Sequence, residues 1–257
     1  MKFIVIGLPK TGKTMLVHTL NNAPGFRVLG EVFNTRDRSP KMPVHPQKVI
    51  EDGRLRDQRN NLHTWFCKKF GISKYDITND LLSGDTYNMI SEFLDTIFLP
   101  DSHCGFKLHH HHIELTPQLE TYITDHQEIR LIHCLRRNKI KQAIASIGNR
   151  HRGERFECSP PGALDLINDY MYRTKEVRRM FSAREHYKEV YYEDLTEDRD
   201  KNVLDLKELK MFFDVDMPLE KEILTRKNTK NKVSENLLNF VEFKDYFKDT
   251  VYKEFID

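Results

Sequence analysis

The chain has 257 residues, of which 39% are hydrophobic and 31% are charged. This length allows a buried core that needs neither disulfides nor metals. The composition is too apolar for a disordered chain and too polar for a membrane protein. The 41 basic and 39 acidic residues leave a net charge of +2, so no field of the whole molecule indicates nucleic acid or a membrane as the partner. Any anion-binding site must therefore be local.

Cysteine usage and the apolar start of the chain bear on the cellular compartment. Cys67, Cys104, Cys134 and Cys158 are far apart and form no C-x-x-C pair, which favours reduced thiols over a disulfide framework. The first apolar run is too short for a signal-peptide core or a transmembrane helix. We therefore expect a cytoplasmic protein without membrane insertion and without a nucleic-acid partner. The sequence does not indicate an oligomeric state.

Short apolar runs alternate with longer amphipathic patterns along the chain. The first strand is expected at Phe3–Leu8 and the first helix at Lys13–Asn21. Further strands are expected at Phe26–Leu29, Cys104–Leu108, Ile129–Leu135 and Val190–Tyr192, and further helices at Asn79–Leu99, Pro117–Thr124, Lys139–Asn149 and Leu164–Arg184. This alternation predicts the α/β class, with a central parallel sheet flanked by helices in three layers.

Two segments depart from the alternation. Asn34–Gln58 is rich in Arg, Asp and Pro, which is typical of a surface loop, either one that covers a site or a plain solvated one. From about Leu204 the pattern is mostly helical, and it ends in an aromatic-rich stretch at Leu237–Phe255. We expect that stretch to be a lid packed on the same core. Because no repeat or linker is found, residues 1–257 are expected to form one domain.

A glycine-bearing loop follows the first strand and opens the first helix. The run Gly7-Leu8-Pro9-Lys10-Thr11-Gly12-Lys13-Thr14 fits the pattern G-x-x-x-x-G-K-[ST]. In that context backbone N–H groups and the helix N-terminus hold a phosphate. The loop therefore predicts an anion site in a fold like that of the P-loop nucleotide triphosphatases. One function that follows is a small-molecule kinase, in which Lys13 reaches the β- and γ-phosphates of ATP and Thr14 binds magnesium.

The same loop also resembles the 5′-phosphosulfate loop of sulfotransferases that use 3′-phosphoadenosine 5′-phosphosulfate. Lys13 stands where that family usually has a hydroxyl residue. The run Leu131–Ser146 resembles the family's 3′-phosphate segment, in which an arginine ends a strand and a helix follows. The arginine is Arg137 here. The family's serine commonly stands eight residues later, at Ala145 in this chain, whereas Ser146 is nine residues away.

Two later segments extend the resemblance over nearly the whole chain. Val190–Leu195 is similar to the family's Tyr-Glu-Asp-Leu strand end, whose aromatic residue, here Tyr192, lies near the adenine. The run Arg226-Lys227-Asn228, followed by Ser234-Glu235-Asn236, resembles the C-terminal region in which a basic pair reaches the 3′-phosphate. An alternative for the Tyr-Glu-Asp run is an acidic strand end of a triphosphatase, with Asp194 as the magnesium ligand.

The resemblance implies that 3′-phosphoadenosine 5′-phosphosulfate is the co-substrate and that no metal is needed. The residues that would hold the 5′-phosphosulfate are Lys10, Thr11, Gly12, Lys13, Thr14 and Met15. Those that would hold the 3′-phosphate are Arg137, Ser146, Arg226 and Lys227, with Tyr192 near the base. The acceptor would be a hydroxyl or amine of a small molecule or carbohydrate.

Sulfuryl transfer needs a base for the acceptor proton and cations that stabilise the charge on the transferring group. Gly105–His109 resembles the Lys-x-His element of cytosolic sulfotransferases, in which the lysine, here Lys107, touches the sulfuryl group and the histidine takes the proton. Gly30–Asn34 resembles the Gly-Glu-x-Phe element of bacterial sulfotransferases, in which the glutamate is the base. His109 and Glu31 are therefore the two candidate bases, with His109 preferred, while Lys10 and Lys107 are the candidate cations.

The four consecutive histidines at 109–112 also suggest a metal site. Adjacent residues at a strand end point in different directions, whereas structural zinc usually draws on separated ligand pairs. We therefore expect packing or surface histidines, one of them catalytic. A nucleotide-binding protein without catalysis is a third functional class, and it would lack a base.

Overall fold

The computed structural model describes residues 1–33, 86–98, 102–151, 154–196, 207–215 and 232–256. The surface loop expected at Asn34–Gln58 and the basic pair Arg226 and Lys227 lie outside these residues, as does Cys67. The three cysteines inside them, Cys104, Cys134 and Cys158, are free and buried.

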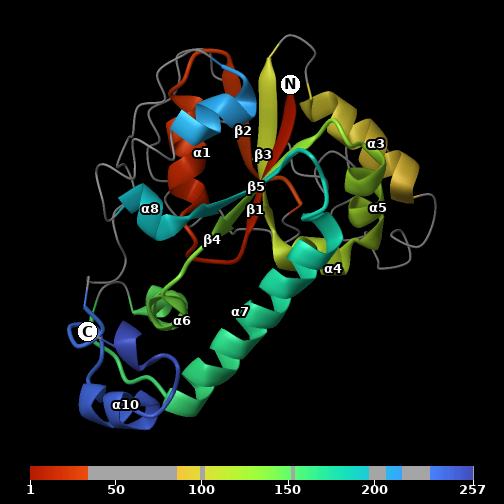
Figure 1. Ribbon diagram of the computed structural model, residues 1–257. Helices are drawn as coiled ribbons and strands as arrows, with labels where there is room; N and C mark the ends of the chain where they lie inside the picture. The colour runs from red at the N-terminus through yellow and green to blue at the C-terminus, as the bar shows by residue number, and fades with distance from the viewer. Residues whose placement is uncertain (34–85, 99–101, 152–153, 197–206, 216–231, 257) are drawn as a thin grey trace.

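A parallel sheet forms the centre of the described molecule (Figure 1). Its strands are β1 (Lys2–Gly7), β2 (Phe26–Glu31), β3 (His103–His109), β4 (Arg130–Leu135) and β5 (Tyr187–Tyr191), in the spatial order β2-β3-β1-β4-β5. All neighbouring pairs run parallel. The α/β class and each of the expected strands are thus confirmed. The last strand begins three residues earlier than expected, and Tyr192 opens the short helix α8 (Tyr192–Thr196) instead of ending the strand.

Both faces of the sheet are covered by helices (Figure 1). Alternate residues of β1 point to opposite faces, as the period of a strand requires. Phe3 and Val5 pack with α1 (Lys13–Asn21), whereas Ile4 and Ile6 pack on the other face. That other face is covered by α3 (Thr86–Ile97) and α5 (Pro117–Asp125). The central strands β1 and β4 are buried on both sides, which explains why they read as continuous apolar runs, whereas the edge strand β5 is only partly buried.

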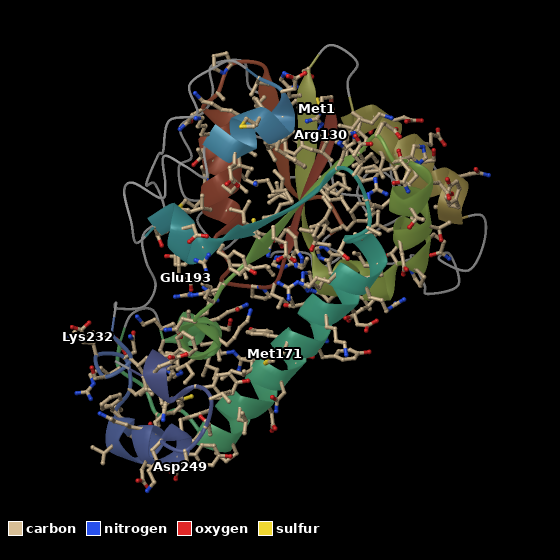
Figure 2. All side chains as sticks on the ribbon, viewed as in Figure 1. Met1, Arg130, Met171, Glu193, Lys232 and Asp249 are labelled. Atoms are coloured by element: carbon tan, nitrogen blue, oxygen red, sulfur yellow. The ribbon has the colours of Figure 1, made fainter. Side chains whose placement is uncertain are left out.

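A third apolar cluster lies beyond the sheet. It joins α6 (Lys139–Ile147), the first half of α7 (Pro160–Phe181) and the C-terminal segment with α10 (Phe240–Phe247) and the short helix η5 (Lys253–Phe255). Figure 2, in which Met171 marks α7 and Asp249 follows α10, shows the side chains between them. The C-terminal aromatic stretch therefore packs on α6 and α7, and the expectation that it packs on the core of the sheet was wrong.

Helix α7 starts four residues earlier than the sequence suggested. Ser159 caps it by accepting a hydrogen bond from the Gly162 N–H at 3.3 Å, and prolines occupy the first turn, where no backbone N–H is needed. With 22 residues it is a long helix, and charged residues recur along it. Of the helices in the described ranges, none has the length and apolar character needed to cross a membrane.

Candidate active site

The predicted phosphate loop lies between the carboxyl end of β1 and the start of α1. Gly12 is the N-cap residue of α1, with a φ of 81°, and Lys10 also has a positive φ of 61°. The Thr11 hydroxyl donates to the Leu8 carbonyl at 2.8 Å, which closes the turn. Because Gly12 has no side chain with which to cap the helix, the first N–H groups of α1 remain directed out of the helix end. This is the geometry of an anion site.

Lys13 lies beneath this loop. Its ammonium donates to the carbonyls of Gly7, at 2.7 Å, and Leu8, and it lies 3.3 Å from Nδ1 of His109. The side chain is almost fully buried, and burial lowers the pKa of Lys13 to about 7. In this structure the ammonium therefore holds the loop from below. The Met15 side chain is likewise buried, in the apolar cluster under α1.

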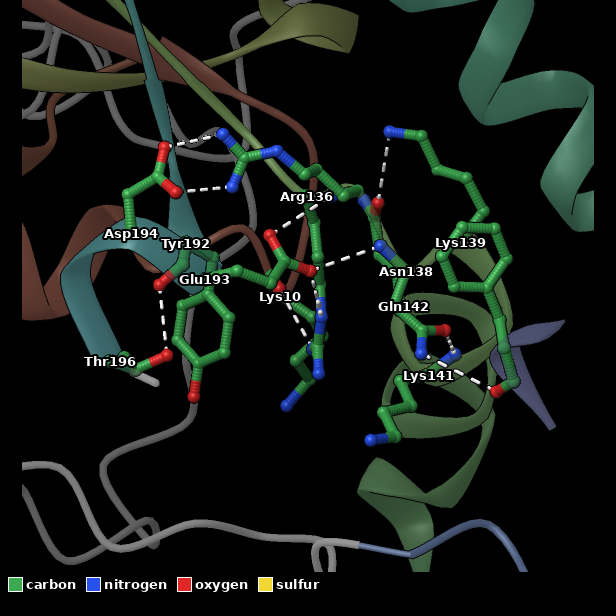
Figure 3. Close-up of polar contacts among 12 residues, drawn as sticks. Lys10, Arg136, Asn138, Lys139, Lys141, Gln142, Tyr192, Glu193, Asp194 and Thr196 are labelled. Carbon is green, nitrogen blue, oxygen red and sulfur yellow. Dashed lines mark hydrogen bonds and ion pairs between the residues drawn. The ribbon is translucent and has the colours of Figure 1, made fainter. Parts of the chain in front are cut away.

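Lys10 lies on the exposed side of the loop, next to Arg136 (Figure 3). Lys10 Nζ donates to Asn149 Oδ1 at 2.7 Å, and an Arg136 guanidinium nitrogen donates to the Lys10 carbonyl at 3.3 Å. Burial, and the Arg136 charge after it, lower the pKa of Lys10. The Arg136 guanidinium also lies 4.7 Å from the ring centroid of Tyr192. A Cβ at Gly12 would come within 2.7 Å of that ring, so Tyr192 packs directly on the loop.

Arg136 is a site residue that the sequence reasoning missed. The motif pointed to Arg137, but consecutive residues at a strand end face opposite sides. Arg137 makes a bidentate ion pair with Asp194 on α8, and its guanidinium lies 4.3 Å from the Tyr191 ring centroid. Two of its five N–H donors thus face Asp194, while about half of its side chain is exposed. The adjacency of two arginines was the only signal for Arg136.

Ser146 lies on α6 and faces α7. Its hydroxyl donates to the Gln142 carbonyl at 3.0 Å and accepts from Tyr170 Oη at 2.8 Å. The hydroxyl is therefore engaged in helix packing. One turn earlier, the Gln142 side chain donates to the Pro9 carbonyl at 3.0 Å and so connects α6 to the loop. Gln142 is a second residue that the sequence did not mark.

Three of the four predicted catalytic residues come together at the carboxyl ends of β2 and β3. Glu31 Oε1 lies 2.9 Å from Lys107 Nζ and 3.0 Å from His109 Nε2. Lys107 Nζ also donates to the Thr14 hydroxyl, at 3.3 Å, in the first turn of α1. The carboxyl ends of neighbouring parallel strands share one edge of the sheet, where ligands commonly bind. The cluster of Glu31, Lys107 and His109, called the strand-end cluster below, therefore adjoins the phosphate loop.

The charges within the strand-end cluster follow from its contacts. Burial disfavours ionisation of Glu31, but hydrogen bonds from His109 and Lys107 outweigh it and hold the pKa of the carboxyl far below its ordinary value. Burial lowers the pKa of His109 to about 4, although the bond to Glu31 opposes this shift. At neutral pH Glu31 is therefore ionised and His109 is neutral.

Of the consecutive histidines, only His109 belongs to a strand. The others open the helix α4 (His110–Leu115), which the sequence did not predict. His112 Nδ1 accepts from the His109 backbone N–H at 3.3 Å, and His110 is buried. Within the described residues, no group of three or more His, Cys, Asp or Glu side chains is arranged to hold a metal ion.

A buried hydrogen-bonded chain extends from α4 away from the loop. His110 Nε2 lies 3.0 Å from Nε2 of His133, and His133 Nδ1 lies 2.6 Å from Tyr187 Oη. The Tyr187 hydroxyl donates to Glu189 at 3.0 Å, and Arg178 pairs with the same carboxylate. Burial lowers the pKa of His133 to about 3 and holds the pKa of His110 well below its usual value. Both imidazoles are therefore neutral in the folded protein.

This histidine pair predicts a loss of stability in acid. Because an unfolded histidine binds a proton near pH 6.5, the unfolded state holds more protons than the folded state below that pH. The contribution of this pair to the free energy of unfolding should therefore fall as the pH falls below 6.5, by about 2 kcal/mol per histidine at pH 5, and stay constant above pH 7.5. Urea unfolding at pH 5 and at pH 7.5 measures the difference in the free energy of unfolding. A His133→Asn variant should lose part of the slope that the parent protein shows. An unchanged slope in this variant would contradict the prediction.

No family model matches the chain, and no curated protein matches it. The solved structures that are similar to it include three sulfotransferases. A sulfotransferase from Mycobacterium avium has a TM-score of 0.49 and 15% identity, over 96% of this chain and 75% of that one. A sulfotransferase from Alicyclobacillus acidocaldarius has a TM-score of 0.48 and 14% identity, over 98% and 94%. The sulfotransferase domain of the Synechococcus PCC 7002 olefin synthase has a TM-score of 0.43 and 16% identity, over 94% and 82%. The assignment of function therefore depends on the residues of the site.

Proposed function

We propose that this chain transfers a sulfuryl group from 3′-phosphoadenosine 5′-phosphosulfate to an acceptor hydroxyl or amine. The observation that supports this most is the contact between the strand-end cluster and the phosphate loop, through Lys107 and Thr14. The cation Lys107 and the two candidate bases therefore lie next to the proposed anion site. In the reaction the acceptor oxygen or nitrogen bonds to sulfur, its proton passes to the base, and the bond from sulfur to the bridging oxygen breaks, with its electron pair going to the departing phosphate.

The residues around the loop fit such a donor. The uncapped start of α1 offers backbone N–H groups to the 5′-phosphosulfate, and Lys10 stands at the loop's exposed side. The Tyr192 ring against Gly12 provides an aromatic surface beside the loop. Arg137, with about half of its side chain exposed, keeps N–H donors beyond those bound to Asp194 and is proposed for the 3′-phosphate. The donor would supply an activated sulfuryl group.

The kinase alternative has less support from the same contacts. In a kinase the Thr14 hydroxyl would bind magnesium, but here it accepts a hydrogen bond from the Lys107 ammonium. A cation beside that hydroxyl repels a divalent metal ion. Asp194, the acidic candidate for a magnesium ligand, is paired with Arg137.

The proposed acceptor is a small molecule or a carbohydrate. Its pocket would adjoin the strand-end cluster, at the edge of the sheet where β2 and β3 end. We also propose a cytoplasmic location, because the buried free thiols of Cys104, Cys134 and Cys158 suit a reducing compartment.

Adenosine 3′,5′-bisphosphate should raise the melting temperature of the protein without magnesium. A ligand that binds only the folded state stabilises it by mass action, by about 2.7 kcal/mol at one hundred times its dissociation constant. Thermal-shift titrations with the bisphosphate alone and with ATP and magnesium compare the changes in melting temperature that the two ligands cause. Stabilisation by ATP with magnesium and none by the bisphosphate would contradict the proposed sulfotransferase function and support the kinase function.

Arg137→Ala should weaken the bisphosphate much more than adenosine 5′-phosphosulfate, which lacks the 3′-phosphate. Loss of a charge-assisted contact costs about 1.5–3 kcal/mol, or roughly ten- to a hundredfold in affinity. Arg136→Ala is the matched control, because Arg136 contacts the loop itself and should weaken both ligands alike. Calorimetric titration of both ligands tests the pair. Equal losses for both ligands in Arg137→Ala would show that Arg137 does not bind the 3′-phosphate.

A further inference from the structure

Two acidic side chains of α8 accept hydrogen bonds from the start of α6 (Figure 3). Asp194 accepts from both terminal nitrogens of the Arg137 guanidinium, with the contact to Nη2 at 2.6 Å. Glu193 accepts from the backbone N–H groups of Arg137 and Asn138, each at 3.0 Å. The Asp194 and Glu193 side chains are only 16% and 11% exposed, so salt and water screen their charges weakly. Two negative charges therefore lie at the segment proposed to bind the 3′-phosphate.

These carboxylates and the neighbouring arginines form two pairs. Arg136 Nε lies 3.8 Å from Glu193 Oε1, whereas the guanidinium of Arg137 faces Asp194. Hydrogen bonds to Asp194 raise the pKa of Arg137, as expected when a carboxylate stabilises a cation. The positive charge of Arg137 is therefore balanced by Asp194 before any ligand binds.

The Arg137 guanidinium still has donors for a ligand. It carries five N–H groups, of which Asp194 takes one from each terminal nitrogen. Among the residues that the structure describes, no other acceptor bonds to this guanidinium, and about half of the side chain is exposed. The Tyr191 ring lies 4.3 Å away over one face. A phosphate can therefore bind at the edge of the guanidinium, next to the Asp194 carboxylate.

A 3′-phosphate and a 3′-hydroxyl respond differently to Asp194. An ionised phosphate only accepts hydrogen bonds, so it competes with the carboxylate for the cation and is repelled by the charge of the carboxylate. A hydroxyl is uncharged and can donate a hydrogen bond to a carboxylate. Asp194 therefore opposes the binding of nucleotides with a 3′-phosphate and does not oppose those with a 3′-hydroxyl.

We propose that Asp194 is a specificity-determining residue, which lowers the affinity for the 3′-phosphate by competing with it for Arg137. The proposal rests on the proposed sulfuryl transfer, in which the 3′-phosphate remains on the departing bisphosphate. Release of product limits the turnover of many enzymes. The competition weakens the binding of that product, so Asp194 sets the balance between capture of the donor and release of the bisphosphate.

Asp194→Asn tests the competition, because the amide keeps the shape of the side chain and removes its charge. Adenosine 3′,5′-bisphosphate should bind about tenfold more tightly, which is the lower end of the effect of a neighbouring charge, because Arg137 is half exposed. The affinity for adenosine 5′-phosphosulfate should stay unchanged. Calorimetric titration of both ligands at one ionic strength measures the affinities, and Asp194→Ala repeats the test if the first variant does not fold. Unchanged or weaker binding of the bisphosphate overturns the proposal, as does an equal gain for both ligands.

Asp245→Asn is the matched control. It removes the same charge from an exposed pair with Lys248, next to α10 and remote from Arg137 in the sequence. Both affinities should stay unchanged in this variant. A gain for the bisphosphate equal to that in Asp194→Asn would be an effect of net charge and would overturn the proposal.

The rate of release separates competition at Arg137 from long-range attraction. Competition acts on the bound state, so the bisphosphate should dissociate from Asp194→Asn about tenfold more slowly in a stopped-flow displacement experiment. A gain that lies only in the association rate and disappears at high salt would be electrostatic steering and would overturn the proposal. If the parent protein binds the bisphosphate and Asp194→Asn binds it more weakly, the competition fails while the proposed function stands. If neither protein binds the bisphosphate, the proposed function fails, and the competition fails with it.

Discussion

Lys10→Met should slow sulfuryl transfer by about a hundredfold or more while the affinity for adenosine 3′,5′-bisphosphate changes little. A preorganised cation acts mainly on the charge that develops as the bond to sulfur breaks, and removal of one such group typically costs about 10²–10³ in rate. Lys10 suits this role because its positive φ and its bond to Asn149 hold the ammonium at the loop in advance. Steady-state kinetics with a saturating donor measures the loss.

The control for this prediction is Lys248→Met. Lys248 is an exposed lysine next to α10 that pairs with Asp245, remote from the loop in sequence and in fold. It should leave both turnover and binding unchanged. Normal turnover in Lys10→Met with weakened binding of the bisphosphate would show that Lys10 binds the donor in the ground state and does not contribute to catalysis.

Gly7→Ala should lower the free energy of unfolding by about 2–4 kcal/mol, a large share of the stability of a protein of this kind. A Cβ at Gly7 would lie 2.6 Å from the Cys134 carbonyl oxygen and 2.9 Å from the Thr11 hydroxyl. The carbonyl belongs to the backbone of β4, so it cannot move without displacing the centre of the sheet. Denaturant unfolding followed by circular dichroism measures the change.

Gly30→Ala is the matched control, because no atom lies within 4 Å of a Cβ at that position. Its stability should stay within about 0.5 kcal/mol of the parent. The two glycines lie near the carboxyl ends of β1 and β2, two strands that β3 separates in the sheet, and they differ in the space available to a Cβ. Equal stability of the two variants would contradict the close approach of β1 and β4 at Gly7.

The sequence predicted the centre of the sheet well because β1 and β4 are buried on both faces. Continuous apolar runs such as Phe3–Ile6 indicate buried strands because turns bound them and they are too short for helices. The first helix was predicted at its observed bounds, since Gly12 and the loop define its start. Prediction failed at α4, where a run of histidines has neither strand nor helix periodicity, and at the start of α7, where the cap at Ser159 was overlooked.

The candidate site could be predicted in its residue types but not in its contacts. Glu31, Lys107 and His109 were singled out from separate motifs, and their meeting depends on β2 and β3 being neighbours. The loop motif predicted a phosphate contact for Lys13. The sequence does not show on which side of the loop the lysine side chain lies. The buried partners His110 and His133 lie in segments whose pattern shows only burial, and their pairing is set by the tertiary fold.

The position of β1 in the sheet has a consequence for biosynthesis. β1 is the central strand, yet its partners β3 and β4 are encoded roughly 100 and 125 residues later. Because ribosomes add about 5–20 residues per second, β1 remains unpaired for on the order of 5–20 s after it is made. During that time Phe3, Ile4, Val5 and Ile6, all fully buried in the final fold, are exposed to other nascent chains. Pairing at such sequence separation also makes refolding slow, so chaperones that bind short apolar segments should govern the yield of this protein when it is produced rapidly.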